Sequence, residues 1–391
     1  MSAPDRSIRR EVGSQFVIGL PGPEIDASTR ELLETVRPGG VILFARNLKS
    51  PEQVSEFNRS LRSMLGRDLL LCIDHEGGRV NRMVDFLGKI PSAQQITFLK
   101  DPEIAREHGH WCGRVLKFLG FNLNLAPVVD LLLKPNTDNS VPDRCWGRTA
   151  PEVITLAGAF LEGMQAERVL GSAKHFPGYG GVDQDPHLVL PKIERSAREL
   201  YQEDMLPYKE LAKPSRKAPA RQLHCIMISH AHVAAFDRKT TPALLSPFVV
   251  QKVLRRRLRF GGVIISDDLE MGAIIRTMPL ERATAQTLAN GVDLPLICHT
   301  PDKIVSAFEA SVKALEKKKI QASTLRACRA RIRAFKARFP AAPKFDAEKW
   351  RRIVEGNAEF TQRVLAALPE EAKNLNLAFR PVGESYLPKY D

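Results

Sequence analysis

The sequence predicts an α/β fold, a single (β/α)8 TIM barrel followed by a C-terminal helical or irregular tail. The chain has 391 residues, a normal length for a barrel with insertions. Eight short runs rich in Val, Ile and Leu alternate with amphipathic helical patterns, and these runs show little of the polar alternation of half-exposed strands. Hydrophobic residues make up 43% of the chain, which is enough for a large core.

The elements follow one another regularly along the chain. Strands are predicted at residues 15–20, 40–44, 69–73, 121–129, 170–175, 224–229, 262–266 and 292–298. Helices are predicted between them, for example at residues 51–65, 102–119, 151–164, 195–211 and 244–258, and several follow Ser, Thr, Asp or Pro start signals. A doubly wound open sheet would need a glycine-rich phosphate turn after the first strand, and residues 19–23 (GLPGP) do not form one. We therefore assign residues 1–340 to a barrel domain and 341–391 to an extension packed on it or trailing from it.

Charge and cysteine content narrow the class of protein. The formal net charge is +13, but the excess lies in short runs such as residues 255–257 and 317–319, without interleaved aromatic residues. A solvated basic surface is therefore favoured over a polyanion-binding role, and no nucleic-acid partner is expected. No secretory signal is evident and no apolar run approaches the roughly 20 residues needed to span a bilayer, so we expect a cytoplasmic protein without membrane contact. The six cysteines form no CxxC pair and are predicted to be reduced, buried thiols.

Ionisable residues gather where the predicted strands end. In a barrel of this kind the chemistry lies at the carboxyl ends of the strands. Six of the eight strands end in such groups, namely Asp74-His75-Glu76, Asp130, Lys174-His175, His230, Asp267-Asp268 and His299. This gathering predicts an active site at one mouth. His230 and His232 share a strand face without a recognisable third metal ligand, so we expect neither a metal nor a cofactor. With no GxSxG motif or cysteine nucleophile signature, carboxylate and histidine chemistry remains.

Five ordered segments resemble one known family. Residues 173–180 (AKHFPGYG) with 185–187 (DPH) are similar to the hallmark of the β-N-acetylglucosaminidase branch of glycoside hydrolase family 3, KHFPGHG followed by DSH. Residues 74–82 (DHEGGRVNR) resemble its DQEGGRVxR segment. The further similar segments are 124–130 (NLAPVVD) with 143–144 (DR), 227–230 (MISH) and 262–271 (GVIISDDLEM). The resemblance covers about residues 12 to 315 and implies a (β/α)8 barrel, in agreement with the strand count.

The resemblance also implies a mechanism. Retaining hydrolysis needs a nucleophile and a proton donor. The family pattern assigns the nucleophile to Asp267 and makes His187, oriented by Asp185, the acid/base on a mobile loop. An imidazole with a pKa near 6.5 can give and take back a proton at neutral pH. For holding the sugar, the pattern points to Asp74, Arg82, Arg144, Lys174 and His175.

The resemblance further implies a substrate. The best-known members of this branch remove non-reducing N-acetylglucosamine from muropeptide fragments during bacterial cell-wall recycling. We therefore expect a carbohydrate substrate and a monomeric, cytoplasmic enzyme.

This chain departs from the family pattern within the loop. Tyr179 replaces a usual His, Gly181 a usual Asp, and Pro186 the usual Ser between Asp185 and His187. Proline fixes its own φ and removes an N–H, so Pro186 is expected to alter loop motion and efficiency more than the identity of the reaction.

Alternatives stay open at this point. The binding residues could instead form an ion-pair network across the barrel top, and Asp268 is a better candidate for a structural or capping role than Asp267. The same site could carry out phosphorolysis, because a histidine acid/base would not repel an incoming phosphate. A non-catalytic, polyanion-binding barrel is the third possibility, since a fold alone does not determine function.

Overall fold

A closed barrel of parallel strands forms the centre of the protein. The computed structural model describes residues 3–135, 141–183, 189–339, 344–373 and 375. The eight barrel strands follow the order β1-β12-β11-β9-β7-β6-β3-β2 and close on themselves through parallel pairing of β1 with β2. They are β1 (Val17–Gly19), β2 (Gly40–Leu43), β3 (Leu70–Ile73), β6 (Leu123–Asn124), β7 (Leu170–Phe176), β9 (Cys225–Ile228), β11 (Val263–Asp268) and β12 (Leu294–Ile297). The predicted (β/α)8 barrel is confirmed.

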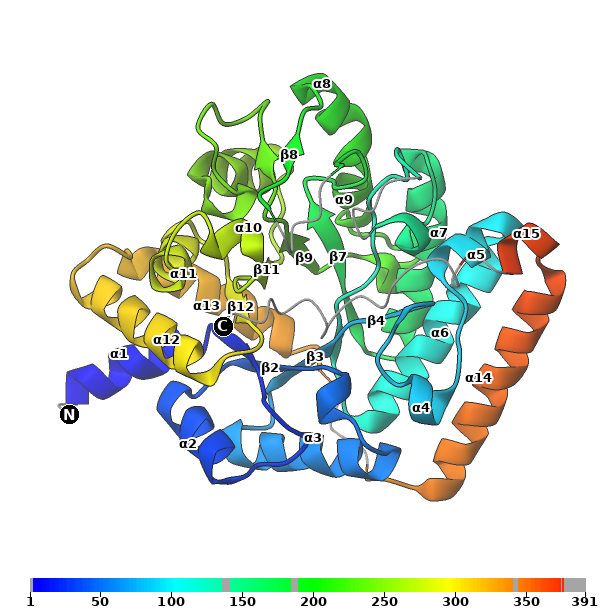
Figure 1. Ribbon diagram of the computed structural model, residues 1–391, viewed down its shortest axis with the longest axis horizontal. Helices are drawn as coiled ribbons and strands as arrows, with labels where there is room; N and C mark the ends of the chain where they lie inside the picture. The colour runs from blue at the N-terminus through cyan, green and yellow to red at the C-terminus, as the bar shows by residue number, and fades with distance from the viewer. Residues whose placement is uncertain (1–2, 136–140, 184–188, 340–343, 374, 376–391) are drawn as a thin grey trace.

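Helices surround the barrel, as Figure 1 shows. They are α1 (Ala3–Gly13), α2 (Ala27–Val36), α3 (Pro51–Leu65), α4 (Val84–Leu87), α5 (Ala93–Leu99), α6 (Pro102–Leu119), α7 (Ala150–Ala166), α8 (Ala197–Glu199), α9 (Leu206–Leu211), α10 (Gly272–Ile275), α11 (Leu280–Ala289), α12 (Pro301–Glu316), α13 (Ala322–Lys336), α14 (Ala347–Ala367) and α15 (Glu370–Lys373). Short 3-10 turns occur at η1 (Ala45–Asn47), η2 (Pro142–Arg144), η4 (Pro219–Arg221) and η5 (Ala243–Leu245), and π-helical segments at η3 (Leu200–Asp204) and η6 (Phe248–Arg257).

Two small sheets extend the carboxyl ends of the barrel strands. An antiparallel pair, β4 (His75–Gly77) and β5 (Val80–Asn81), follows β3. A parallel pair, β8 (Lys192–Ile193) and β10 (His232–Val233), joins the segments after β7 and β9. Both pairs therefore build on the mouth where the sequence predicts the active site.

The strand prediction for residues 121–129 is wrong in length, while the other seven fall on barrel strands. Only Leu123 and Asn124 form β6. Pro127 has no N–H to donate to a ladder, so regular pairing stops, although its carbonyl still accepts from Lys174 N at 3.2 Å. An isolated bridge between Val128 and Lys174 keeps the segment beside β7.

The helices that are predicted correctly begin and end at capping residues that can be recognised in the sequence. α3 begins where Ser50 accepts from Gln53 N, with Pro51 in the first turn. α6 begins at Pro102 after the Asp101 cap and ends at Leu119, and it is followed by the C-cap Gly120, whose φ of 90° suits glycine. Predicted helix 151–164 corresponds to α7.

Two continuous helices predicted from the sequence are wrong. Residues 195–211 divide into α8, η3 and α9, and Pro207 lies at the start of α9, where its missing N–H does no harm. Residues 244–258 divide into η5 and η6, with Pro247 between them. In both segments a proline lies at the point where the hydrogen-bonding pattern changes.

Helix α13 closes the amino end of the barrel. Ile332 and Phe335 pack in one apolar cluster with the first residues of several strands, including Val17 and Leu70. Arg331 Nε donates to Asp293 Oδ1 at 2.8 Å, and Lys336 Nζ donates to the Gly39 carbonyl at 2.7 Å. The carboxyl end is thus the end at which a substrate can approach the strands.

The last helices lie against α5 and α6, on the outside of the barrel (Figure 1). The Trp350 ring of α14 stacks on Phe118 of α6 at 5.6 Å between centroids and meets Phe86 of α4 at 6.1 Å. Gln95 Nε2 donates to the α15 carbonyls of Ala372 and Lys373 at 3.2 and 3.3 Å. These contacts fix the described part of the C-terminal segment to the barrel.

The cysteine prediction is confirmed, since all six cysteines are free and buried. None of the described helices is both long enough and apolar enough to cross a bilayer.

Candidate active site

A buried ion-pair network lies at the carboxyl ends of β3 and β7. Lys174 Nζ contacts Asp74 Oδ1 at 2.5 Å and Glu76 Oε1 at 2.6 Å. Arg144 donates two hydrogen bonds to the same Glu76 carboxylate, from Nε to Oε2 at 2.8 Å and from Nη2 to Oε1 at 2.9 Å. The structure therefore brings together three of the residues expected to hold a sugar, Asp74, Arg144 and Lys174, through a fourth residue, Glu76.

The charges in this network are mutually compensated. Burial alone would raise the pKa of the Glu76 carboxyl, but Arg144 and Lys174 outweigh it and hold that pKa well below its usual range. The Lys174, Glu76 and Arg144 side chains are 3%, 5% and 7% exposed, whereas Asp74 is 16% exposed. Asp74 is thus the member of the network most accessible to a ligand.

A second ion pair holds the loop that carries Arg144. Arg79 Nε donates to Asp143 Oδ1 at 2.7 Å, and both side chains are buried. Burial raises the pKa of Asp143 despite the opposing effect of Arg79. The pair joins the β4–β5 turn to η2 and so positions the neighbouring Arg144.

His175 is oriented by a fully buried carboxylate. Its Nδ1 donates to Asp130 Oδ2 at 2.7 Å, and its backbone N–H donates to Asp130 Oδ1 at 3.1 Å. The same Asp130 Oδ1 accepts from Tyr179 N at 2.7 Å, at the beginning of the segment that leads to His187. Because Nδ1 is occupied by Asp130, Nε2 is the ring nitrogen left to meet a ligand.

Asp267 lies next to last in β11, at the same end of the barrel. Its Oδ1 accepts the backbone N–H of Asp268 at 2.8 Å, and its side chain is half-buried. Asp268 holds the turn that precedes α10, since its Oδ1 accepts from Glu270 N at 3.1 Å, whereas the N-cap of α10 is Met271; its contacts are structural rather than helix-capping. A short carboxylate at a barrel strand end is well placed for attack on a substrate in the mouth.

Arg82 follows β5 and lies near the ring of Phe44, with its Cζ 5.9 Å from the ring centroid. Arg46 lies over the same ring at 4.7 Å. Phe44 follows β2, so two guanidinium groups flank one aromatic side chain beside the mouth.

Asp185, Pro186 and His187 lie outside the described residues, so their predicted roles stay predictions. Tyr179, earlier in the chain, lies among the described residues. Tyr179, which stands where the family pattern has His, is buried and meets the His175 ring edge-on at 5.9 Å. Tyr179 thus packs against the residue that Asp130 orients.

Sequence reasoning misses the importance of Glu76 and Asp130. From the sequence, both residues are only ionisable groups at the ends of predicted strands, without an assigned role. The sequence does contain one indication of their roles. Each is an acidic residue at a strand end, in a mouth that also contains the basic residues Lys174, His175 and Arg144. Among the residues that the structure describes, no group of three or more His, Cys, Asp or Glu side chains could hold a metal ion.

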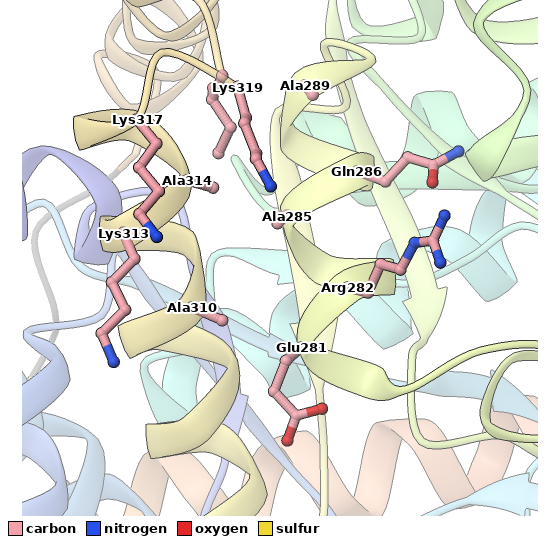
Figure 2. Close-up of a pocket in the computed structure, with 11 residues that line it drawn as sticks. Glu281, Arg282, Ala285, Gln286, Ala289, Ala310, Lys313, Ala314, Lys317 and Lys319 are labelled. Atoms are coloured by element: carbon pink, nitrogen blue, oxygen red, sulfur yellow. The ribbon is translucent and has the colours of Figure 1, made fainter.

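A groove of about 730 Å³ lies elsewhere, between α11 and α12 on the outside of the barrel. Figure 2 shows alanines such as Ala285 and Ala314 facing the space between these two helices, with Lys319 directed into it. None of the predicted site residues lines it. The groove is therefore separate from the mouth where the ionisable residues converge.

Residues 8–334 match the family described as Glycosyl hydrolase family 3 N terminal domain. The chain belongs to glycoside hydrolase family 3. A Beta-hexosaminidase from Methylococcus capsulatus is 36% identical over 295 residues, which cover 74% of this chain and 84% of that relative.

Solved structures of family 3 enzymes share the fold. A glycoside hydrolase family 3 β-N-acetylglucosaminidase from Paenibacillus sp. str. FPU-7 has a TM-score of 0.82 and 29% identity, over 90% of this chain and 68% of that one. A fungal multi-domain family 3 β-N-acetylglucosaminidase has a TM-score of 0.87 and 27% identity, over 92% of this chain. The present chain spans 43% of that larger protein's length.

These matches confirm the predicted family, its β-N-acetylglucosaminidase branch and the prediction of a glycoside hydrolase. They support β-hexosaminidase activity on a carbohydrate substrate.

Proposed function

We propose that this family 3 enzyme is a retaining exo-glycosidase that removes terminal, non-reducing, β-linked N-acetylglucosamine from peptidoglycan (muropeptide) fragments. We propose further that it acts as a monomer in the cytoplasm. The observation that carries the proposal is the position of Asp267 at the carboxyl end of β11, in the mouth that also holds the Asp74–Lys174–Glu76–Arg144 network. A nucleophile and a set of hydroxyl-binding groups are two requirements of such a site.

In the first step, an Asp267 oxygen bonds to the anomeric carbon as the bond to the leaving oxygen breaks. His187, oriented by Asp185, gives its proton to that oxygen. In the second step, water attacks the anomeric carbon, His187 takes the proton of the water, and the Asp267 carboxylate is released. Each proton that leaves the imidazole is thus returned in the same cycle.

The sugar hydroxyls are held by charge-assisted bonds. Asp74 is the most exposed carboxylate of the network and would accept from hydroxyls first. Lys174 and Arg144 have N–H groups to donate, and His175 offers Nε2 because Asp130 occupies Nδ1. This set is also compatible with the structural alternative of an ion-pair network, because the same bonds keep the groups rigid before the sugar arrives.

The muropeptide part of the proposal is supported by charge. Arg46 and Arg82 flank Phe44 at the end of β2 and give the mouth a basic edge. Such an edge suits an aglycone that bears carboxylates.

A substrate panel tests the proposal. Turnover of a nitrophenyl N-acetylglucosaminide should far exceed that of the matching glucoside, and the product should be free sugar with or without added phosphate. Asp267→Asn should abolish turnover, while Asp302→Asn, which changes an exposed acid at the start of α12, should not. Sugar-1-phosphate as the main product would instead establish phosphorolysis, and unchanged turnover by Asp267→Asn would contradict the mechanism.

A further inference from the structure

We propose that His299 is a positioning residue for the nucleophile. Held by Arg46, it fixes Asp268, whose backbone in turn orients the carboxylate of Asp267. The inference rests on the proposed function, because it assumes that Asp267 attacks the sugar.

The His299 ring lies between a cation and an anion. It follows β12, its side chain is 19% exposed, and its ring lies 5.4 Å from that of Phe44. Arg46 Nη1 is 3.4 Å from His299 Nδ1, and Asp268 Oδ2 is 3.3 Å from His299 Nε2. Arginine can only donate, so Nδ1 is the acceptor and Nε2 carries the proton that faces Asp268.

Arg46 is itself held in place. Its Nε donates to the carbonyl of Leu20 at 3.0 Å, and its Nη2 donates to that of Cys298 at 2.6 Å. Leu20 follows β1 and Cys298 follows β12, so the guanidinium ties two neighbouring strand ends together. The backbone of His299 is fixed as well, because its N–H donates to Glu270 Oε2 at 2.6 Å.

Asp268 receives contacts from several elements. Its Oδ1 accepts the N–H groups of Glu270 and Cys298 at 3.1 and 3.2 Å, while Oδ2 faces His299. Its backbone carbonyl accepts from His230 Nε2 at 2.6 Å. Its own N–H donates to Asp267 Oδ1 at 2.8 Å, so the position of Asp268 contributes to where that carboxylate points.

Small displacements matter for this chemistry. Moving a reacting group by about 1 Å can cost on the order of a hundredfold in rate. Without the His299 ring, Asp268 Oδ2 loses its partner at the end of β12, and only the contacts of Oδ1 and of the backbone carbonyl still hold Asp268. The end of β11, including the Asp268 N–H that meets Asp267 Oδ1, is then held less tightly, and the Asp267 carboxylate is less well fixed in the attacking position.

Three variants test the inference in the full-length enzyme. His299→Ala removes the ring, His299→Gln restores an amide N–H at about the reach of Nε2, and His110→Ala removes a half-exposed imidazole from α6 as a control. The measurements are kcat and KM for a nitrophenyl N-acetylglucosaminide, and the rate at which a 5-fluoro-N-acetylglucosaminyl fluoride labels the protein. Denaturant unfolding reports whether each variant is folded.

We expect His299→Ala to lower kcat and the labelling rate about tenfold to a hundredfold while KM stays within about threefold. His299→Gln should recover most of that loss, and His110→Ala should match the wild type. Wild-type kcat in His299→Ala, or a loss that only parallels unfolding, would overturn the positioning role. A His299→Gln variant as slow as His299→Ala would do the same.

The residue that is labelled distinguishes a failure of positioning by His299 from a failure of Asp267 as the nucleophile. If the wild type is labelled at Asp267 but His299→Ala is labelled equally fast, positioning by His299 fails and the nucleophile stands. If the wild type is labelled at another residue, the proposed nucleophile itself fails.

Discussion

The burial of His75 beside the site can be tested by measuring the stability of the protein at acid pH. His75 is the first residue of β4, between Asp74 and Glu76, and it is 1% exposed. Neither ring nitrogen has a hydrogen-bond partner among the described residues. Burial, together with the nearby His108 and Arg82, lowers the pKa of His75 to about 3. The perturbation we propose is His75→Gln, because the family pattern has Gln at this position.

The magnitude follows from proton linkage. The unfolded chain takes up a proton on His75 near the ordinary histidine pKa of 6.5, whereas the native protein does so only at a pKa of about 3. The folded pKa of this base is lowered, so its contribution to stability is complete above pH 6.5 and is lost as pH falls toward 3. The native state should lose about 2 kcal/mol by pH 5 and about 3 kcal/mol by pH 4 through this group. His75→Gln should remove that loss.

The assay is urea unfolding of the wild type and His75→Gln at about pH 7.5, 5 and 4. The free energy of unfolding of the variant, relative to the wild type, should rise by about 2 kcal/mol between pH 7.5 and 5. His110→Gln, which changes a half-exposed imidazole on α6, should follow the wild-type pH dependence. Parallel curves for the wild type and His75→Gln would refute the reasoning.

Three other changes have expected outcomes. Glu76→Gln removes the carboxylate that pairs with Arg144 and should lower the free energy of unfolding by about 3–5 kcal/mol, since it leaves buried cations uncompensated; a urea curve within about 1 kcal/mol of the wild type would argue against this. Asp130→Asn weakens the hold on His175 and should lower kcat/KM about tenfold or more, and wild-type kinetics would contradict that role. Trp350→Ala should cost about 3 kcal/mol by removing the ring that docks α14, measured by urea unfolding, and a neutral result would mean that α14 is held by other contacts.

The fold is largely predictable because its signals are local. Strands buried on both faces give apolar runs, and caps such as Ser50 and Asp101 mark helix starts. The errors occur at Pro127, Pro207 and Pro247, where an apolar or periodic pattern continues but a backbone N–H is missing. Composition alone does not show whether the chain resumes the same element after such a point.

The location of the site can be predicted from the sequence, but the contacts between its side chains cannot. Because active-site residues of a barrel lie at the carboxyl ends of its strands, Lys174 and Asp267 can be assigned to one mouth without knowing which side chains they contact. Glu76 and Arg144 are 68 residues apart, and their pairing depends on how the loops after β3 and β6 are arranged in space. The sequence therefore indicates which residues reach the mouth, whereas the register and loop paths decide which of them bind each other.

The central claim is that Asp267 forms a covalent bond with the sugar. The most direct measurement is to trap the intermediate with a 5-fluoro-N-acetylglucosaminyl fluoride, digest the protein and locate the added sugar by mass spectrometry. We predict one sugar per chain, attached to Asp267, and no labelling of Asp267→Asn. A label on Asp268 or Asp74, or turnover of substrate without any trapped adduct, would contradict the account.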